Sequence, residues 1–181
     1  MAKEVMSPVL CIDPGFRAMG ITIYDFNTRT ILYGGAYLID KKDYTIKKKK
    51  TGSSKADAWV AESLIIWLNS IVSKYSVNWV IMEIPHGMQG YRPLVTMTII
   101  SGAIIGWAIA RALPLAYITP EANKKAATGS HRAQKEEMGK RVMKEWKKFN
   151  WKALPANEQE HVWDAAALIF SAQQLINKKE G

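Results

Sequence analysis

The strongest indication of the fold is the stretch Val9-Leu10-Cys11-Ile12-Asp13-Pro14-Gly15. Four consecutive apolar residues predict a buried strand, and the Pro-Gly pair predicts that the strand ends at Asp13 in a turn. A second stretch, Trp79-Val80-Ile81-Met82-Glu83, has the same pattern and is followed by Ile84-Pro85. Each of these two strands therefore ends in a carboxylate, which a sheet presents at its edge.

A right-handed crossover between the two strands would make them parallel neighbours, about 5 Å apart at the backbone. Asp13 and Glu83 would then share one site. Asp164 lies far along the chain in a helical pattern, three residues after His161, so these two side chains share a helix face. Glu160 faces roughly the same way and is an alternative acid. Clustered carboxylates repel one another, and the usual remedies are a bound cation or a raised pKa.

Each of these residues also has an ordinary explanation when it is taken alone. An Asp before Pro-Gly is usually a turn residue, and a Glu at a strand end is often a surface acid. Asp164 could pair with a lysine, and His161 could be a structural histidine. Their joint arrangement favours a metal site.

Apolar periodicity along the chain predicts an α/β protein with one sheet of mixed strand direction. The first three strands are joined by short turns, which predicts an antiparallel meander. No repeat or linker divides the 181 residues, so we expect a single domain over residues 1–181. We expect strands at 8–13, 19–25, 30–38, 79–83 and 115–118, a short helix or turn at 121–128, and helices at 56–75, 94–113, 131–149 and 158–177.

The formal net charge of +9 favours a polyanionic partner, usually nucleic acid. The N-terminus lacks the charged and apolar pattern of a secretory signal, so we do not expect secretion. Cys11, the single cysteine, lies in the first strand and requires no oxidising compartment. We therefore expect a cytoplasmic protein of a microbial cell or a virus-infected host.

Residues 41–55 are polar and strongly basic, and we expect a mobile loop or insertion there. A solvated charge run and an arm that contacts phosphates explain this composition about equally well. If the arm binds DNA, the contacting residues are Lys47, Lys48, Lys49 and Lys50.

Residues 94–110 carry no charge, and Arg92 and Arg111 bracket them. The segment is slightly shorter than a typical membrane span, contains several Thr, Ser and Gly residues, and has no counterpart elsewhere. We therefore predict a buried helix and no membrane association. Gly102 and Gly106 are four residues apart, which predicts a close helix contact such as a dimer axis would provide.

Four blocks of sequence, in order along almost the whole chain, resemble the RuvC-type Holliday-junction resolvases of the ribonuclease-H-like nuclease superfamily. The resemblance implies a mixed five-stranded sheet flanked by helices. It also implies a metal-dependent endonuclease that acts in DNA recombination and repair, resolving four-way junctions by paired symmetric cuts. The blocks are Ile12-Asp13-Pro14-Gly15 with Gly20, Met82-Glu83, residues 124–136 and residues 161–168.

The same resemblance assigns roles to individual residues. Asp13, Glu83, His161 and Asp164 match the metal-binding catalytic positions, and the third of these is Asp in some members and His in others. The implied cofactor is Mg²⁺ or Mn²⁺, two ions per site, with Asp13 between them. Oxygen-rich ligands suit either ion, and His161 shifts the preference towards Mn²⁺. The helix after Glu83 matches one that forms the family's homodimer interface.

Basic residues around the Gly129-Ser130 turn are candidates for DNA binding. Lys124 and Lys135 match two family positions implicated in DNA binding and catalysis. Lysines beside the exposed amides of a helix start could hold a phosphate, although an ordinary charged helix entry explains them as well. The candidates here are Lys124, Lys125, Arg132 and Lys135.

Two features depart from the family's pattern or have a competing explanation. An aromatic residue three places after the glutamate often inserts at the junction in this family, but here that place is His86. His86 and Tyr91 are the two candidates for this role. Trp146 and Trp151, with lysines nearby, could stack on bases, but core packing explains them at least as well.

Three other functions remain open. The chain could be a broader nuclease for flaps and forks, or a junction-binding protein without catalysis. It could also be a nucleotide-binding fragment of the actin and sugar-kinase class, whose first strand also ends in an Asp-Gly-type turn. The chain is too short for the two-lobed architecture of that class, which ranks last.

Overall fold

The five-stranded sheet has the mixed direction that the sequence predicts. The computed structural model describes residues 7–84 and 90–178, and the strand order is β3-β2-β1-β4-β5. β1 pairs antiparallel with β2, and β2 pairs antiparallel with β3, whereas β1–β4 and β4–β5 are parallel pairs. The strands are β1 (Val9–Asp13), β2 (Ala18–Asp25), β3 (Thr30–Leu38), β4 (Trp79–Glu83) and β5 (Leu115–Ile118).

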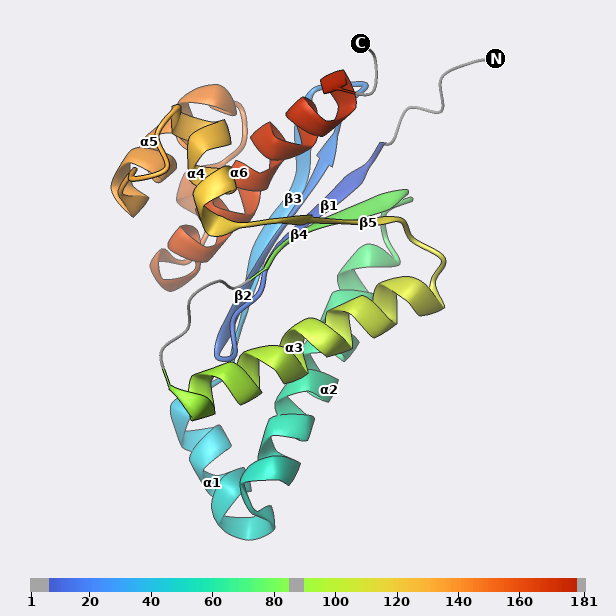
Figure 1. The fold of residues 1–181 in the computed structure, drawn as a ribbon, viewed down its shortest axis with the longest axis vertical. Coiled ribbons are helices and arrows are strands. Elements are labelled where there is room, and N and C mark those ends of the chain that lie inside the picture. Colours follow the sequence, from blue (N-terminus) through green and yellow to red (C-terminus); the bar gives the residue numbers. More distant parts are fainter. Residues whose placement is uncertain (1–6, 85–89, 179–181) are drawn as a thin grey trace.

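Helices cover both faces of the sheet (Figure 1). On one face lie α1 (Lys41–Thr51), α2 (Ser53–Val72) and α3 (Tyr91–Ala110). On the other lie α4 (Pro120–Thr128), α5 (Lys135–Glu145), a short 3₁₀ turn (Trp151–Ala153) and α6 (Ala156–Lys178). This is the ribonuclease-H-like arrangement, so the predicted fold class is confirmed.

Alternation along β1 sends side chains to two separate cores. Leu10 and Ile12 pack in the cluster with α2 and α3. Val9 and Cys11 pack in the cluster with α5 and α6, and burial raises the pKa of the Cys11 thiol well above its usual range. Because successive strand residues point to opposite faces, Asp13 continues the face that α6 covers.

Residues 41–51 form a regular helix, so the expected mobile loop over 41–55 is wrong. Asp40 Oδ1 caps the helix by accepting the backbone N–H of Lys42 at 2.6 Å. Lysines in the last turn complement the negative end of the helix dipole. Gly52, with φ of 83°, separates α1 from α2. The helix buries only Tyr44, so its sequence lacks the apolar periodicity that would have predicted it.

Helix α3 is less buried than the sequence predicts. One face, including Ile100, Ile104 and Trp107, packs in the core, whereas Leu94 and Ile109 on the other face are exposed. The helix is long and apolar enough to cross a membrane, but a single helix of this kind is weak support for a membrane protein. It packs against α2 as an integral part of the fold.

Candidate active site

Asp13 and Glu83 lie at the same edge of the sheet. The parallel register pairs Ile12 with Met82, so the two acidic residues end neighbouring strands at one level. Both continue the alternation that points Cys11 and Ile81 towards α6. The two strand ends that the sequence singles out are therefore brought together.

Helix α6 brings the third acidic residue to this edge. It packs across β1, β2 and β3, and its first half contains His161 and Asp164. The approach is close because Gly20 on β2 has no side chain: a Cβ there would lie 1.9 Å from the backbone oxygen of His161. Thr22 Oγ1 donates a hydrogen bond to the neighbouring Val162 oxygen at 3.5 Å.

The three carboxylates influence one another's ionisation. Burial, and then the charges of Asp164 and Glu83, raise the pKa of Asp13 well above its usual range. Burial also raises the pKa of Glu83 and of Asp164, and each of these shifts is partly offset by a polar neighbour. The site is therefore an acidic cluster in which burial and mutual repulsion both disfavour the ionised carboxylates.

Lys135, the first residue of α5, pairs with the α6 side of the cluster. Its Nζ lies 3.5 Å from Asp164 Oδ2 and hydrogen-bonds Glu160 Oε1. Burial lowers the pKa of Lys135, but these two carboxylates outweigh it and the net pKa is raised. Glu160 is 51% exposed and Asp164 only 17%, so Asp164 is the acid that faces the cluster.

Asn123 on α4 is a site residue that sequence reasoning missed. Its Nδ2 donates to Glu83 Oε2 at 3.0 Å and to the backbone oxygen of Asp164 at 3.4 Å. The residue is 1% exposed, and its Oδ1 is buried without a hydrogen-bond partner among the described residues. One amide thus joins β4 to α6. The sequence offers little signal for this role beyond Asn123 sharing the buried helix face of Ala127.

The residues present fit a hard divalent cation. Over residues 7–84 and 90–178, no group of three or more Asp, Glu, His or Cys side chains is arranged in this conformation so that it could hold a metal ion. Asn123 and Lys135 instead hold Glu83 and Asp164 through polar contacts. The donors nonetheless comprise three mutually repelling carboxylates and an unpartnered amide oxygen, which is the chemistry that Mg²⁺ and Mn²⁺ prefer.

The other predicted site residues are spread more widely. Lys124 is close enough to Glu83 to lower its pKa. Lys125 and Arg132 are exposed nearby in the chain, and Tyr91 is exposed at the start of α3. His86 lies outside the described residues. Lys47, Lys48, Lys49 and Lys50 lie on α1, in the helical layer on the opposite face of the sheet from Asp164.

Trp146 and Trp151 are core residues. Both are buried, and Trp151 Nε1 donates to the Trp146 backbone oxygen at 3.0 Å. Base stacking by these rings is therefore excluded in this conformation, and the core-packing interpretation is correct.

Solved structures with this fold include several junction resolvases. T. thermophilus RuvC in complex with a Holliday junction substrate is 15% identical, with a TM-score of 0.68 over 92% of this chain and 94% of that chain. Thermus thermophilus RuvC is 15% identical, with a TM-score of 0.66 over 92% and 95%. The yeast mitochondrial Holliday junction resolvase Ydc2 is 14% identical, with a TM-score of 0.60 over 91% and 77%. At these identities the likeness establishes a shared fold.

Comparison of the sequence with protein families gives a more specific result. A search of curated protein sequences finds no match. The family model described as "Crossover junction endodeoxyribonuclease RuvC", however, matches residues 9–170, which include every residue of the acidic cluster. The chain therefore belongs to the RuvC family.

Proposed function

We propose that this chain is a divalent-cation-dependent endonuclease that resolves four-way DNA junctions by paired, symmetric phosphodiester hydrolysis. The observation that carries the proposal is the half-buried acidic cluster of Asp13, Glu83 and Asp164, assembled from two strand ends and a helix in a RuvC-family chain. Such a cluster is unfavourable in the free protein and is suited to a cationic cofactor.

Asp13, Glu83, Asp164 and His161 would hold two Mg²⁺ or Mn²⁺ ions. Asp13 is central because the charges of both other carboxylates act on it. His161 is close enough to Asp164 to lower its pKa, which supports their serving one ion together. When bound, a pair of divalent cations supplies activation of water and neutralisation of charge at a phosphodiester.

The chain's own polar residues orient this cluster and attract the substrate. Asn123 fixes the position of the Glu83 carboxylate. Lys135 offsets the charge of Asp164 in the free protein, and its ammonium becomes available to a DNA phosphate when the acid takes another partner. Lys124 is close enough to Glu83 to lower its pKa, and the exposed Lys125 and Arg132 are proposed as secondary contacts.

The proposed active form is a homodimer formed through α3. Gly102 and Gly106 are exposed, and a Cβ at either position would meet nothing within 4 Å in the described chain outside the neighbouring backbone of α3. Leu94 and Ile109 extend this apolar stripe. A two-fold dimer matches the approximate two-fold symmetry of a four-way junction and places two sites on opposed strands. Tyr91, exposed at the start of α3, is the candidate for inserting into an opened junction.

Cleavage of a synthetic junction tests this proposal. An immobile four-way junction, labelled on each strand in turn, is incubated with Mg²⁺, Mn²⁺ or chelator, and the cuts are mapped on denaturing gels. We expect paired nicks at symmetric positions on opposed strands, which require divalent cation. Asp13→Asn should abolish the cuts and retain junction binding, because it removes negative charge close to the phosphate.

Other substrates separate the remaining alternatives. Equal cleavage of flaps and forks, or unpaired nicks in the junction, would favour a broader structure-selective nuclease. Junction binding without cleavage in either metal would favour a binding protein. Loss of both cleavage and binding in Asp13→Asn would instead indicate misfolding or a different site.

A further inference from the structure

Helix α1 presents a dense set of lysines that form no ion pair with the described residues. Its C-terminal half carries four consecutive lysines, of which Lys47 is half-buried and the other three are exposed. Across the parts of the chain that the structure describes, no ion pair joins any of them to an acidic side chain. The helix therefore concentrates positive charge that no intramolecular contact neutralises. The exposed lysines of this surface are Lys41, Lys42, Lys48, Lys49, Lys50 and, at the start of α2, Lys55.

Core packing does not account for these lysines. Tyr44 is the only residue of α1 that is buried. Lys47 lies over the ring of Trp59, with Nζ 5.9 Å from the ring centroid, so its stem covers apolar surface while its charge stays accessible. Adjacent like charges repel one another, and a polyanion would relieve that repulsion.

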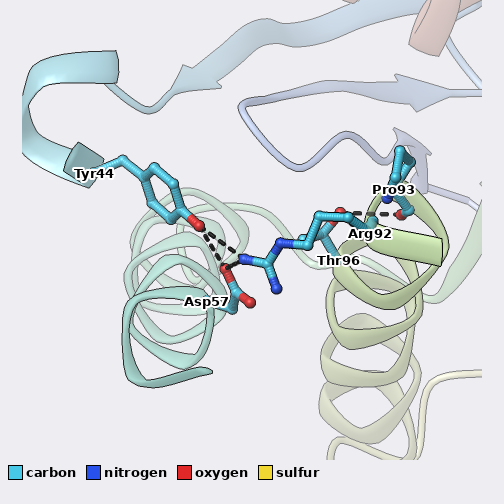
Figure 2. A network of polar contacts seen from close by, with 5 residues as sticks. All are labelled: Tyr44, Asp57, Arg92, Pro93 and Thr96. Atoms are coloured by element: carbon cyan, nitrogen blue, oxygen red, sulfur yellow. Dashed lines mark hydrogen bonds and ion pairs between the residues drawn. The ribbon is translucent and has the colours of Figure 1, made fainter. Parts of the chain in front are cut away.

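A buried polar network fixes α1 in place (Figure 2). Tyr44 Oη donates to Asp57 Oδ1 at 2.9 Å, and Arg92 Nη2 donates to the same oxygen at 2.6 Å and to Tyr44 Oη at 2.9 Å. Asp57 is 1% exposed, whereas the Arg92 side chain is 45% exposed. The three residues come from α1, α2 and α3, so one network holds the three helices together.

The network connects the basic surface to the part of the chain that follows the acidic cluster. Arg92 is the second residue of α3, the first helix after Glu83 along the chain. Figure 1 shows α1 beside the start of α3, at the end of the molecule opposite to the two termini. The lysines are therefore held at a fixed place relative to α3, rather than on a loose arm.

We propose that α1 is a second DNA-binding surface, which contacts the phosphate backbone of a duplex arm at a distance from the cleavage site. This inference rests on the proposed function for its substrate. Lysines distributed around a short helix read charge and backbone position rather than base sequence. The Tyr44–Asp57–Arg92 network sets where that arm lies relative to α3.

Charge-removal variants test the proposal on both branched and unbranched DNA. The α1 variant combines Lys47→Gln, Lys48→Gln, Lys49→Gln and Lys50→Gln, which keeps helix-forming side chains. The matched control combines Lys144→Gln, Lys147→Gln, Lys148→Gln and Lys152→Gln, four exposed lysines between the end of α5 and the 3₁₀ turn. Fluorescence anisotropy, in buffer without divalent cation, gives affinity for a duplex and for a four-way junction across a salt series. Thermal melts verify that both variants fold.

We expect the α1 variant to bind the duplex about tenfold more weakly at moderate salt, with a salt slope less negative by about 2 to 4, since each lost phosphate contact contributes about 0.9. The control should stay close to wild type. An α1 variant that binds like wild type, or a control that loses as much, overturns the proposal. So does lysine-dependent binding to anionic phosphatidylserine vesicles without binding to DNA. If the α1 lysines strengthen binding to the duplex but the wild-type protein does not prefer the four-way junction, the proposed function is contradicted. The assignment of α1 as a DNA-binding surface then still stands.

Discussion

Asn123 donates a hydrogen bond from Nδ2 to Glu83 Oε2 across 3.0 Å. The same nitrogen reaches the backbone oxygen of Asp164 at 3.4 Å, so one buried amide spans two of the three acidic segments. Partners that orient a ligand carboxylate often matter almost as much for a metal as the ligand itself. Asn123 is therefore a positioning residue for the cluster.

Asn123→Leu should weaken binding of Mn²⁺ by about 10-fold or more. The substitution keeps a similar volume but removes the donor that holds Glu83, and it also removes the unpartnered Oδ1. Isothermal titration of the nuclease with Mn²⁺ measures the change. Asn69→Leu is the matched control, because Asn69 also takes part in a side-chain hydrogen-bond network, in the other helical layer. Its Oδ1 accepts hydrogen bonds from Trp107 Nε1 and Arg111 Nη2. Equal metal affinity in wild type and Asn123→Leu would contradict the positioning role.

Removing one carboxylate should stabilise the metal-free protein, and more so as pH rises. The pKa values of Asp13, Glu83 and Asp164 are raised in the folded state, so the native protein binds more protons than the unfolded chain above about pH 4. Their contribution to stability is full below that pH and is lost as pH rises through the folded pKa values. Asp13→Asn should therefore be more stable than wild type at pH 8, by an amount that grows as pH rises through the folded pKa values; each unit of pKa shift is worth about 1.4 kcal/mol.

Urea denaturation in chelator from pH 4.5 to 8 gives this difference directly. Subtracting the free energy of unfolding of wild type from that of Asp13→Asn at each pH cancels the contributions of groups with the opposite pH dependence. Such groups include Asp25 and Glu160, whose pKa values are lowered by hydrogen bonds. Added Mn²⁺ should reverse the order of the two proteins, because only wild type retains all the ligands. If the stability difference between Asp13→Asn and wild type shrinks as pH rises, the raised pKa values described for the cluster are refuted.

Breaking the ion pair between Arg92 and Asp57 should destabilise the fold. Arg92→Met leaves the buried Asp57 without its ion-pair partner, although the Tyr44 hydroxyl still donates to it. Loss of one partner of a buried ion pair costs about 3–5 kcal/mol. Because Arg92 is partly solvated, we expect about 2 kcal/mol by chemical denaturation. Asp57→Asn in the same chain should recover much of that loss, and a double-mutant cycle gives the coupling. Additive effects of the two substitutions would argue against a coupled network.

Filling the small-residue face of α3 should separate the proposed dimer. Gly102 has open space around the position of a Cβ, so Gly102→Leu fits the single chain and improves helix propensity by roughly 1 kcal/mol. A leucine at a close helix contact would block association. Sedimentation velocity should therefore show a shift towards monomer, whereas Ala58→Leu, at an exposed position of α2, leaves the assembly unchanged. A Gly102→Leu protein that sediments like wild type would exclude this face as the interface.

The sequence predicts those parts of the fold that depend on local pattern. Apolar runs that stop at Asp13 and Glu83 identify two strands and their parallel pairing, because burial and turn chemistry are encoded within a few residues. Helix α1 escapes prediction for the converse reason. Its stability comes from the Asp40 cap, the helix dipole and one buried tyrosine, none of which produces periodicity.

The residues of the candidate site likewise fall into two groups, those that the sequence predicts and those that only the folded structure identifies. The acidic residues stand out because each occupies an unusual local position. Asn123 does not stand out, because its importance comes from contacts with residues 40 and 41 positions away in the chain. The distance over which Lys135 pairs with Asp164 is likewise fixed only by how α5 packs on α6. Roles that depend on tertiary contact need the folded structure.

Gly20 gives β2, a strand that contributes no residue to the acidic cluster, control over the spacing of that cluster. Its missing side chain lets the backbone of α6 rest directly on β2 at His161. A single methyl group at this position would act as a wedge, tilting the start of α6 outward and carrying Asp164 away from Asp13. The separation of the carboxylates that would bind cations is thus set by a main-chain contact, and a glycine in β2 makes that contact possible.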